Sequence, residues 1–284
     1  MSPGVTMAAI LRRNRALAMG VDVGGTWVRA IVTRDGRPLT RARTRTNRVP
    51  ALSRFLRRVL DDCGVTRVDG LVVASRGIWT PRERARLRAR LRRLARRVHV
   101  MSDAQAALLG ALDGRPGVLV LAGTGSIVLG RSADGRWARA GGLGPLLGDE
   151  GSAFWLGREW LRAVARDGDF ARARAAARAA APVARIAALA PRVLAAARHG
   201  NPRARTVVRA AQVHLAGFVL DVVRRLRLRT PVDVSWAGGV LDDPTFRAGV
   251  ARAVSRAGLR ARWRAPAAPA VAAATDLAER LAGR

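Results

Sequence analysis

Lysine is absent from this sequence: all 52 basic residues among its 284 are arginines. The absence excludes three kinds of site that need a lysine amine, namely the Walker A phosphate loop, the strand lysine of protein kinases and a Schiff base. Any chemistry on phosphate groups must therefore use glycine backbone, hydroxyl groups, arginine and metal ions. Arginine in place of lysine, together with abundant alanine and glycine, is typical of a GC-rich coding bias.

Acidic residues are also scarce, since 20 Asp and Glu residues leave a formal net charge of +32. A coding bias toward arginine does not explain this shortage. Such a charge favours salt-sensitive, non-specific binding to polyanions. The arginines are nevertheless spread along the whole chain, and aromatic residues that could stack on bases make up only 4%. We therefore expect no specific nucleic-acid partner.

Cysteines and long apolar runs are lacking too. The single cysteine, Cys63, excludes a disulfide framework, and it excludes a cysteine-rich zinc site or an iron–sulfur cluster held by this chain alone. No run of eighteen apolar residues is present, so we expect no membrane span. Residues 1–16 lack the apolar segment of a secretory signal, and they form either a disordered extension or a stretch upstream of a natural start at Met19. A cytoplasmic protein is the resulting expectation.

Two short segments rich in glycine and threonine stand between apolar runs. Residues 22–26 read Asp-Val-Gly-Gly-Thr, and residues 123–126 read Gly-Thr-Gly-Ser. A strand, a tight turn and a second strand would bring backbone N–H groups and a hydroxyl together, which suits an anion of the size of a phosphate. The two segments lie about one domain apart, so they suggest a duplicated domain that holds one nucleotide.

The order of predicted elements repeats along the chain as strand-strand-strand-helix-strand-helix. We expect strands at about residues 17–23, 27–33, 38–44, 70–74, 98–101, 117–122, 126–132, 136–140, 232–237 and 259–264. This repeat predicts an α/β fold with two related domains, residues 17–112 and 113–284, and a cleft between them. A helical insert at about 152–226 would belong to the second domain.

The most specific stretch is residues 141–155, Gly-Gly-Leu-Gly-Pro-Leu-Leu-Gly-Asp-Glu-Gly-Ser-Ala-Phe-Trp. It matches a Gly-Asp-Glu-Gly-Ser-x-x-Trp signature. With this stretch and the two glycine loops, the chain resembles, over about residues 18–275, the sugar kinases and ATPases of the actin, Hsp70 and hexokinase superfamily. Within that superfamily it is similar to the N-acetylglucosamine kinase and BadF/BadG type. The resemblance implies two RNase H-like (actin-like ATPase) domains that bind ATP and Mg²⁺.

The resemblance also implies which residues bind the nucleotide. The two phosphate loops and an adenosine loop would be formed by Gly24, Gly25, Thr26, Gly123, Thr124, Gly125, Gly238 and Gly239. Asp22 would hold Mg²⁺ through water, because Mg²⁺ keeps much of its hydration shell. Arg76 follows a predicted strand, and it is either an anion contact or one more surface arginine.

A sugar hydroxyl is the phosphoryl acceptor that the resemblance implies. Asp103 would be the base that accepts the hydroxyl proton; a helix N-cap is the other role that suits it, and one residue can have both. The sugar itself would be bound by Asn47, Asp103, Ser126, Gly142, Leu143, Gly144 and Asp149. For Asp149, too, a helix-entry cap is the alternative.

Three departures from the family pattern affect the choice of sugar more than phosphoryl transfer. Ile127 stands where the acetylglucosamine kinases have a polar residue, Leu143 replaces an aromatic residue, and residues 269–274 lack a glycine. We expect an ATP-dependent kinase of N-acetylglucosamine, glucosamine or a related hexose, with a homodimer as one option for its assembly. The alternatives are a BadF-type ATPase acting on a partner protein, for which one cysteine is too few, and a non-catalytic sugar- or nucleotide-binding regulator.

Overall fold

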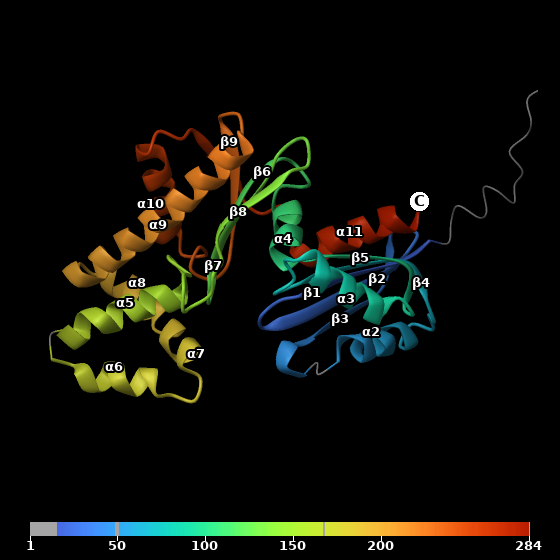
Figure 1. Ribbon diagram of the computed structural model, residues 1–284, viewed down its shortest axis with the longest axis horizontal. Coiled ribbons are helices and arrows are strands. Elements are labelled where there is room, and N and C mark those ends of the chain that lie inside the picture. The colour runs from blue at the N-terminus through green and yellow to red at the C-terminus, as the bar shows by residue number, and fades with distance from the viewer. Residues whose placement is uncertain (1–15, 49–50, 167, 284) are drawn as a thin grey trace, which may run out of the picture. The chain divides into compact units, whose positions relative to one another are not determined.

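Two compact units make up the protein, a computed structural model of which describes residues 16–48, 51–166 and 168–283 (Figure 1). The first unit contains the chain up to Asp113 and the segment from Ala267 onward, and the second contains Gly114–Pro266. Each unit has one five-stranded mixed sheet with helices packed on it, so the expected α/β fold class is confirmed. Residues 1–15 of the expected N-terminal extension lie outside the described residues.

The first sheet has the strand order β3-β2-β1-β4-β5. Its strands are β1 (Leu17–Val23), β2 (Trp27–Arg34), β3 (Arg37–Arg45), β4 (Val68–Ser75) and β5 (Ala95–Ser102), and the short helix η1 (Thr46–Arg48) follows β3. The helices of this unit are α2 (Leu52–Asp61), α3 (Pro81–Leu91), α4 (Asp103–Ala111) and α11 (Ala270–Ala282). Strands β1, β4 and β5 run parallel, so their carboxyl ends meet at one edge of the sheet.

Alternating apolar residues in β1 and β2 build a core on one face of this sheet. Met19, Val21 and Val28 are fully buried and pack with Leu56 and Leu60 of α2. The two leucines are one helical turn apart, which places both on the face of α2 that meets the sheet. The opposite face of β1 is therefore left for another helix.

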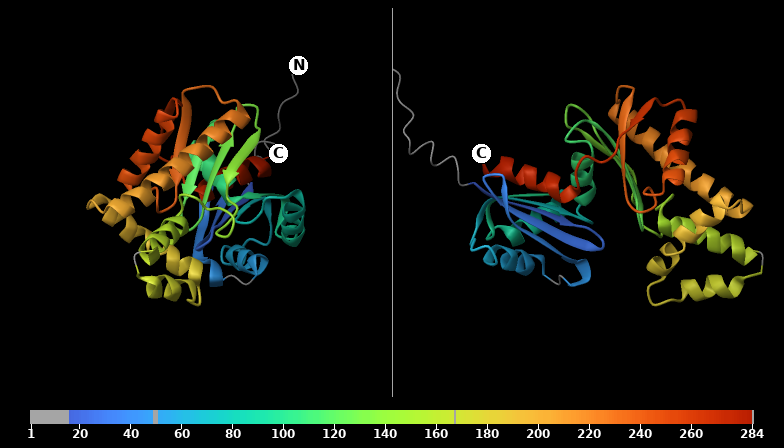
Figure 2. Two further views of the ribbon diagram at one scale, coloured as in Figure 1. Left: turned by 60° about the vertical axis from the view of Figure 1, so that its left-hand side comes forward. Right: turned by 180° about the vertical axis from the view of Figure 1, so that it is seen from behind.

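That helix is α11, which was expected in the second domain but packs on β1 and β4 of the first unit (Figure 2). Its buried Ala274 and Ala278 lie against Ala18 and Val72. Small residues allow a very close approach, since a Cβ added to Gly20 would lie 2.2 Å from the Thr275 hydroxyl oxygen. The predicted extent of the second domain, residues 113–284, is thus corrected. The second unit ends at Pro266, because the last helix completes the core of the first unit.

Backbone hydrogen bonds secure this return of the chain to the first unit. The N–H groups of Ala267 and Ala268 donate to the carbonyls of Ala111 and Gly110, at 3.1 and 3.0 Å. These bonds join the segment before α11 to the end of α4. The C-terminal segment is therefore integrated into the first unit by its backbone as well as by its side chains.

The second sheet has the order β10-β9-β6-β7-β8. Its strands are β6 (Gly117–Ala122), β7 (Ser126–Arg131), β8 (Trp137–Gly141), β9 (Val232–Ala237) and β10 (Ala261–Trp263). When β6 is matched with β1, the two sheets have the same order and the same strand directions. This agreement is what the predicted internal duplication requires.

Helices inserted between β8 and β9 enlarge the second unit. They are α5 (Ala153–Arg166), α6 (Phe170–Ala177), α7 (Pro182–Ala187), α8 (Ala190–Arg198) and α9 (Pro202–Leu226), and α10 (Pro244–Arg256) follows β9. By length and composition alone, α9 could cross a membrane. Its buried Ala211, Leu215, Val219 and Val222 recur at helical spacing and pack into the core of the second unit, as in an amphipathic core helix.

Candidate functional site

Three polar residues lie where the parallel strands of the first sheet end. Asp22 is near the end of β1, Arg76 follows β4, and Asp103 follows β5. Because β4 pairs with both β1 and β5, these positions are neighbours along one edge of the sheet. Ligands of open α/β sheets bind outside the carboxyl ends of the strands, so this edge is the candidate site of the first unit.

The first glycine loop connects β1 and β2 at the same edge. Gly24 N–H donates to the Trp27 carbonyl at 3.0 Å, which closes a tight turn with Gly25 and Thr26 exposed at its tip. The residue after β3 supports this turn, since the Thr46 hydroxyl donates to the Gly24 carbonyl at 2.9 Å. The exposed Asn47 directly follows Thr46, so the predicted sugar contact lies beside the loop.

Asp22 is only 6% exposed and forms an ion pair with Arg29, with 3.1 Å between Oδ2 and Nη1. The antiparallel register places Asp22 opposite Arg29 on the same face of the sheet. Burial raises the pKa of the Asp22 carboxyl, and the Arg29 charge opposes this rise. Asp22, the residue predicted to hold Mg²⁺, thus has one carboxylate oxygen paired with an arginine.

Asp103 begins α4 but does not cap it. The N-cap is Ser102, whose hydroxyl accepts a hydrogen bond from Gln105 N–H at 3.2 Å, while the Gln105 side chain accepts one from Ser102 N–H at 3.0 Å. The Asp103 carboxylate accepts a local hydrogen bond from Ala104 N–H at 2.8 Å. Burial raises the pKa of Asp103, and the nearby Arg76 charge opposes the rise. The alternative role of Asp103 as the helix cap is therefore wrong.

The second glycine loop connects β6 and β7 in the second unit. Gly123 N–H donates to the Gly125 carbonyl at 2.9 Å, and the carbonyls of Gly123 and Thr124 accept from the first N–H groups of α5, at Ala153 and Phe154. The loop is thus bonded to the amino-terminal end of α5. A glycine is needed at position 125, because a Cβ there would lie 2.7 Å from a carboxylate oxygen of Asp149.

Asp149 connects the signature stretch to this loop. It is 7% exposed, has a left-handed backbone conformation with φ of 61°, and accepts a hydrogen bond from Ser126 N–H at 3.3 Å. The Ser126 hydroxyl donates to the Glu150 carbonyl at 2.7 Å, so this hydroxyl already has a partner. Burial raises the pKa of Asp149. Ser152, not Asp149, accepts the capping bond at the start of α5, from Trp155 N–H at 3.1 Å.

The remaining signature residues form a loop before Asp149. Gly142 and Gly144 have positive φ angles of 73° and 81°, which glycine adopts readily. Gly142 packs on Ile127, while the Leu143 side chain is 63% exposed. An apolar side chain in this loop is therefore available to a ligand, although the sequence pattern of related kinases has an aromatic residue there.

Gly238 brings the predicted adenosine loop next to the second phosphate loop. Because β6 and β9 are parallel neighbours, Gly238 follows β9 where Gly123 follows β6. A Cβ at Gly238 would lie 2.4 Å from the Ala122 carbonyl oxygen and 2.8 Å from Gly123 N. Gly239 has open space around its Cα. The structure thus joins Gly123–Gly125, Asp149 and Gly238 at one edge of the second sheet.

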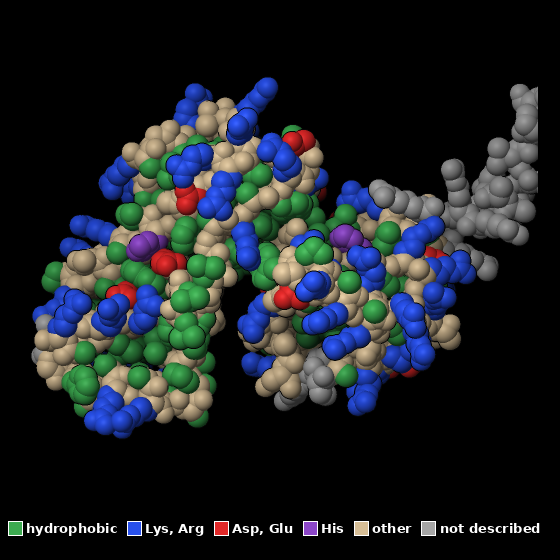
Figure 3. All heavy atoms as spheres, in the orientation of Figure 1, with side chains coloured by type: hydrophobic (Ala, Val, Ile, Leu, Met, Phe, Trp, Pro, Cys, Tyr) green, Lys and Arg blue, Asp and Glu red, His purple; other side chains and the backbone are tan. Residues whose placement is uncertain are grey.

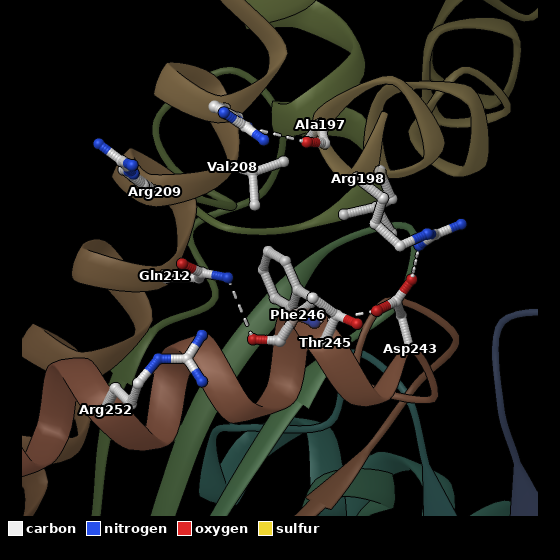
Figure 4. A pocket seen from close by; sticks show the side chains of 11 residues that line it. Ala197, Arg198, Val208, Arg209, Gln212, Asp243, Thr245, Phe246 and Arg252 are labelled. Carbon is white, nitrogen blue, oxygen red and sulfur yellow. Dashed lines mark hydrogen bonds and ion pairs between the residues drawn. The ribbon is translucent and has the colours of Figure 1, made fainter. Parts of the chain in front are cut away.

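A cavity of about 200 Å³ lies among α8, α9 and α10 of the second unit (Figure 4). Arg198, Arg209 and Arg252 line it, and Arg198 forms an ion pair with Asp243, the N-cap of α10. Gln212 donates to the Phe246 carbonyl at 3.3 Å across its floor. Arginines give this cavity a positive charge. Part of its lining, from Asp243 onward, follows the adenosine loop along the chain, and the sequence analysis did not predict the cavity.

Metal binding by protein side chains alone is not indicated. Within residues 16–48, 51–166 and 168–283, no three His, Cys, Asp or Glu side chains group closely enough to hold a metal ion. A single carboxylate such as Asp22 suits Mg²⁺ that is held mainly by nucleotide phosphates and water. A Cβ at Gly238 would meet backbone atoms and one at Gly125 the Asp149 carboxylate, whereas one at Gly25 would meet the end of the flexible Arg76 side chain.

Arg29 is a site residue that the sequence reasoning missed. A signal was available, since Trp27, Arg29 and Ile31 alternate along β2 and a tight turn of known length sets the register with β1. That register predicts the pairing of Arg29 with Asp22 that the structure shows. The exact placement of the Arg76 side chain had no such local signal.

Solved structures support the fold assignment. A crystal structure of a provisionally assigned N-acetylglucosamine kinase from Chromobacterium violaceum matches with a TM-score of 0.70 and 27% identity, and the match covers 93% of this chain and 99% of that one. A ROK family glucokinase from Streptomyces griseus, in complex with glucose and AMPPNP, matches with a TM-score of 0.59 and 19% identity over 93% of this chain and 100% of that one. The second likeness shows the fold alone.

Curated relatives match over shorter stretches. An N-acetylmuramic acid/N-acetylglucosamine kinase from Clostridium acetobutylicum is 42% identical over 73 residues, or 26% of this chain and 24% of that protein. An N-acetyl-D-glucosamine kinase from Dictyostelium discoideum is 42% identical over 71 residues, or 25% of this chain and 22% of that protein. The matched part thus spans about a quarter of the length of these relatives.

A family profile matches both units of the chain. It covers residues 19–275 and therefore includes both sheets, both glycine loops and the signature stretch. The family is described by its ATPase activity, which agrees with two bare glycine loops and buried carboxylates at the sheet edges. The chain belongs to the BadF/BadG/BcrA/BcrD ATPase family.

Proposed function

We propose that this protein is an ATP-dependent kinase that phosphorylates a hydroxyl group of N-acetylglucosamine, glucosamine or a related hexose. The observation that carries the proposal is Asp103. Its carboxylate is not used to cap α4, it lies at the same sheet edge as the first glycine loop, and its strand neighbours place it near Asp22. A carboxylate in this position suits a base that serves phosphoryl transfer.

In the proposed reaction, Asp103 accepts the proton of the attacking sugar hydroxyl, whose oxygen forms a bond to the γ-phosphorus while the bond to the ADP oxygen breaks. Gly24, Gly25 and Thr26 hold phosphate oxygens through backbone N–H groups and a hydroxyl. Asp22 would hold Mg²⁺ through water, and that ion would supply positive charge to the phosphates. Arg29 keeps the Asp22 side chain in place through their ion pair.

Residues of the second unit serve the same reaction in this proposal. Gly123, Thr124 and Gly125 bind phosphate oxygens, and Asp149 holds that loop through Ser126 N–H while offering a carboxylate to sugar hydroxyls. The adjacency of Gly238 and Gly123 would let the adenosine loop and the second phosphate loop contact one nucleotide. The arginine-lined cavity beside α10 suits the adenosine moiety, since guanidinium groups stack on aromatic rings.

The choice of an amino sugar rests on the relatives. Both curated matches act on N-acetylated sugars by name, and the C. violaceum structure is assigned to the same class. The exposed Leu143 offers an apolar contact that suits an acetyl methyl group. Asn47, beside the first loop, provides an amide for sugar hydroxyls or for the acetamido group.

The test is a screen of ADP release from Mg·ATP with N-acetylglucosamine, glucosamine, N-acetylmannosamine and glucose, with product analysis by mass spectrometry. We expect sugar-dependent turnover and a phosphorylated sugar. Asp103→Asn should lower kcat by about 100- to 10,000-fold, as loss of a general base does. Asp61→Asn removes the same charge from an exposed position at the end of α2 and is the matched control. Undiminished turnover in Asp103→Asn would refute the role of the base.

The family assignment favours one second candidate, an ATPase that acts on a partner protein. Against it, the sequence has one cysteine, Cys63, and so cannot itself supply several cysteine ligands to a cluster. ATP hydrolysis that does not depend on any sugar would favour this candidate. Retained ATP binding without any turnover would instead favour a non-catalytic regulator.

A further inference from the structure

Arg76 occupies a central position at the edge of the first sheet. It is the first residue after β4, the strand that pairs with β1 on one side and with β5 on the other. Its own N–H donates to the Val23 carbonyl at 2.9 Å, which fixes its backbone beside the start of the glycine loop. The Arg76 side chain therefore begins between the loop and Asp103.

The guanidinium group of Arg76 lies over the glycine loop. Its Nη1 atom is 2.7 Å, and its Cζ atom 3.6 Å, from the position that a Cβ on Gly25 would occupy. Any other side chain at position 25 would therefore displace the arginine. The Arg76 guanidinium thus lies directly beside the proposed phosphate loop.

The charge of Arg76 is available to a ligand. The side chain is exposed, and among the described residues the structure shows no ion pair for its guanidinium. Arg29, in contrast, is already paired with Asp22. Arg76 does act electrostatically on Asp103, whose charge it stabilises from nearby. Arg76 therefore lies between the phosphate loop and the proposed base, with no ion pair to another described residue.

We propose that Arg76 binds the terminal phosphate of ATP and stabilises the phosphoryl group while it is transferred. This inference rests on the proposed kinase function and adds a residue to it. Phosphoryl transfer depends on fixed cations around the equatorial oxygens, and a planar guanidinium can bind two of them at once. The chain has no lysine to do this, so the cation in contact with the loop must be an arginine.

A purely structural role is the competing explanation, in which Arg76 only packs on Gly25 to hold the loop. The two explanations differ in which nucleotide is affected. A loop support would influence ATP and ADP alike, because both carry a β-phosphate. A contact to the terminal phosphate affects ATP and leaves ADP nearly unchanged.

The experiment compares wild type with Arg76→Gln, Arg76→Lys and the control Arg82→Gln, which removes an exposed arginine from α3. Calorimetric titration with Mg·ATP and Mg·ADP measures binding without any need for turnover. For Arg76→Gln we expect about tenfold or greater weakening for ATP, less than about twofold change for ADP, and a fall in kcat of about 100-fold or more. Arg76→Lys should recover part of kcat, since it keeps the charge but not the fork.

Equal weakening of ATP and ADP, or no weakening of ATP, would overturn the proposal. A wild-type protein that binds ATP but phosphorylates no sugar would refute the proposed kinase function, and the contrast between ATP and ADP would still decide the role of Arg76. Thermal melting of each variant checks its folding. If Arg76→Gln does not fold, Arg76→Lys replaces it. In a folded Arg76→Lys variant, wild-type affinities for both ATP and ADP would count against a bidentate contact.

Discussion

At the scale of single residues, three acidic side chains share one property. Burial raises the pKa of Asp22, Asp103 and Asp149, and each lies beside a glycine loop. Such perturbed carboxyls gather at functional sites because a site must remove charged groups from water to use them. Each of the three has a partner that favours its ionised form: an arginine for Asp22 and Asp103, and a backbone N–H for Asp149.

The raised pKa of Asp103 predicts the pH dependence of the proposed reaction. A base must be ionised, so kcat/KM should fall as the pH decreases through a pKa that lies above the ordinary Asp value of 3.8. Arg76→Gln removes the charge that favours the ionised form, and its acid limb should move to higher pH. Initial rates from pH 4 to 8, roughly the range over which carboxylates titrate, measure both limbs. An acid limb at the same pH in wild type and Arg76→Gln would contradict this expectation.

The raised pKa of Asp103 also predicts how the free energy of unfolding depends on pH. Because the folded-state pKa of Asp103 is raised, ionisation above that pKa costs folding free energy, and the cost disappears as the pH falls below it. Asp103→Asn removes this cost at neutral pH. The variant should therefore melt at the same temperature as wild type or higher, so its loss of turnover cannot be ascribed to unfolding.

At the scale of elements, the local patterns predicted most strands and helices. The strand expected at 17–23 is found at Leu17–Val23, and the strand expected at 232–237 at Val232–Ala237, because apolar runs bounded by turn residues are local signals. Strand β5 was expected over 98–101 but begins at Ala95. Its first residues, Ala95 to Arg97, carry two arginines and continue the composition of α3, so nothing local separates the strand from the helix.

The close packing of α11 on β1 gives a prediction at this scale. Gly20→Ala places a Cβ within 2.2 Å of Thr275 and forces the helix away from the sheet. We expect a loss of about 1–3 kcal/mol in the free energy of unfolding, as overpacking costs. Gly217→Ala is the control, since it lies in α9 with nothing within 4 Å of the new Cβ, and it should be neutral or stabilising by up to about 1 kcal/mol. Urea titrations of both variants measure the two changes in the free energy of unfolding.

At the scale of the whole molecule, the net charge of +32 is the dominant feature. On the face shown in Figure 3, arginine side chains are scattered over many elements and do not gather into one stripe. Some of them contact aromatic rings, as Arg43 and Arg45 do, whose guanidinium carbons lie 3.9 and 4.8 Å from the centre of the Trp27 ring. Arginines scattered in this way create a positive potential over much of the surface and do not form one specific binding surface.

This positive potential predicts a difference in salt dependence between the two substrates. The apparent affinity for anionic ATP should weaken steadily between roughly 0.05 and 0.5 M salt, because screening shortens the reach of the arginine charges. The affinity for a neutral sugar should change little over the same range. Measuring both KM values in one salt series makes the sugar an internal control, and parallel changes of the two would rule out the positive potential as the cause.

The order of elements, the two glycine loops and the signature before α5 follow from the sequence by itself, because turn chemistry and residue periodicity act over a few positions. The spacing of Ser102 and Gln105 is that of a capping box, so it too could be read from the sequence. Only the tertiary structure decided that α11 belongs to the first core, that Ser152 accepts the capping bond beside Asp149, and that Arg76 lies on Gly25. Packing contacts between residues far apart in the chain, and competition among neighbouring polar groups for the same N–H donors, settle such questions. Neither leaves a pattern in a single sequence.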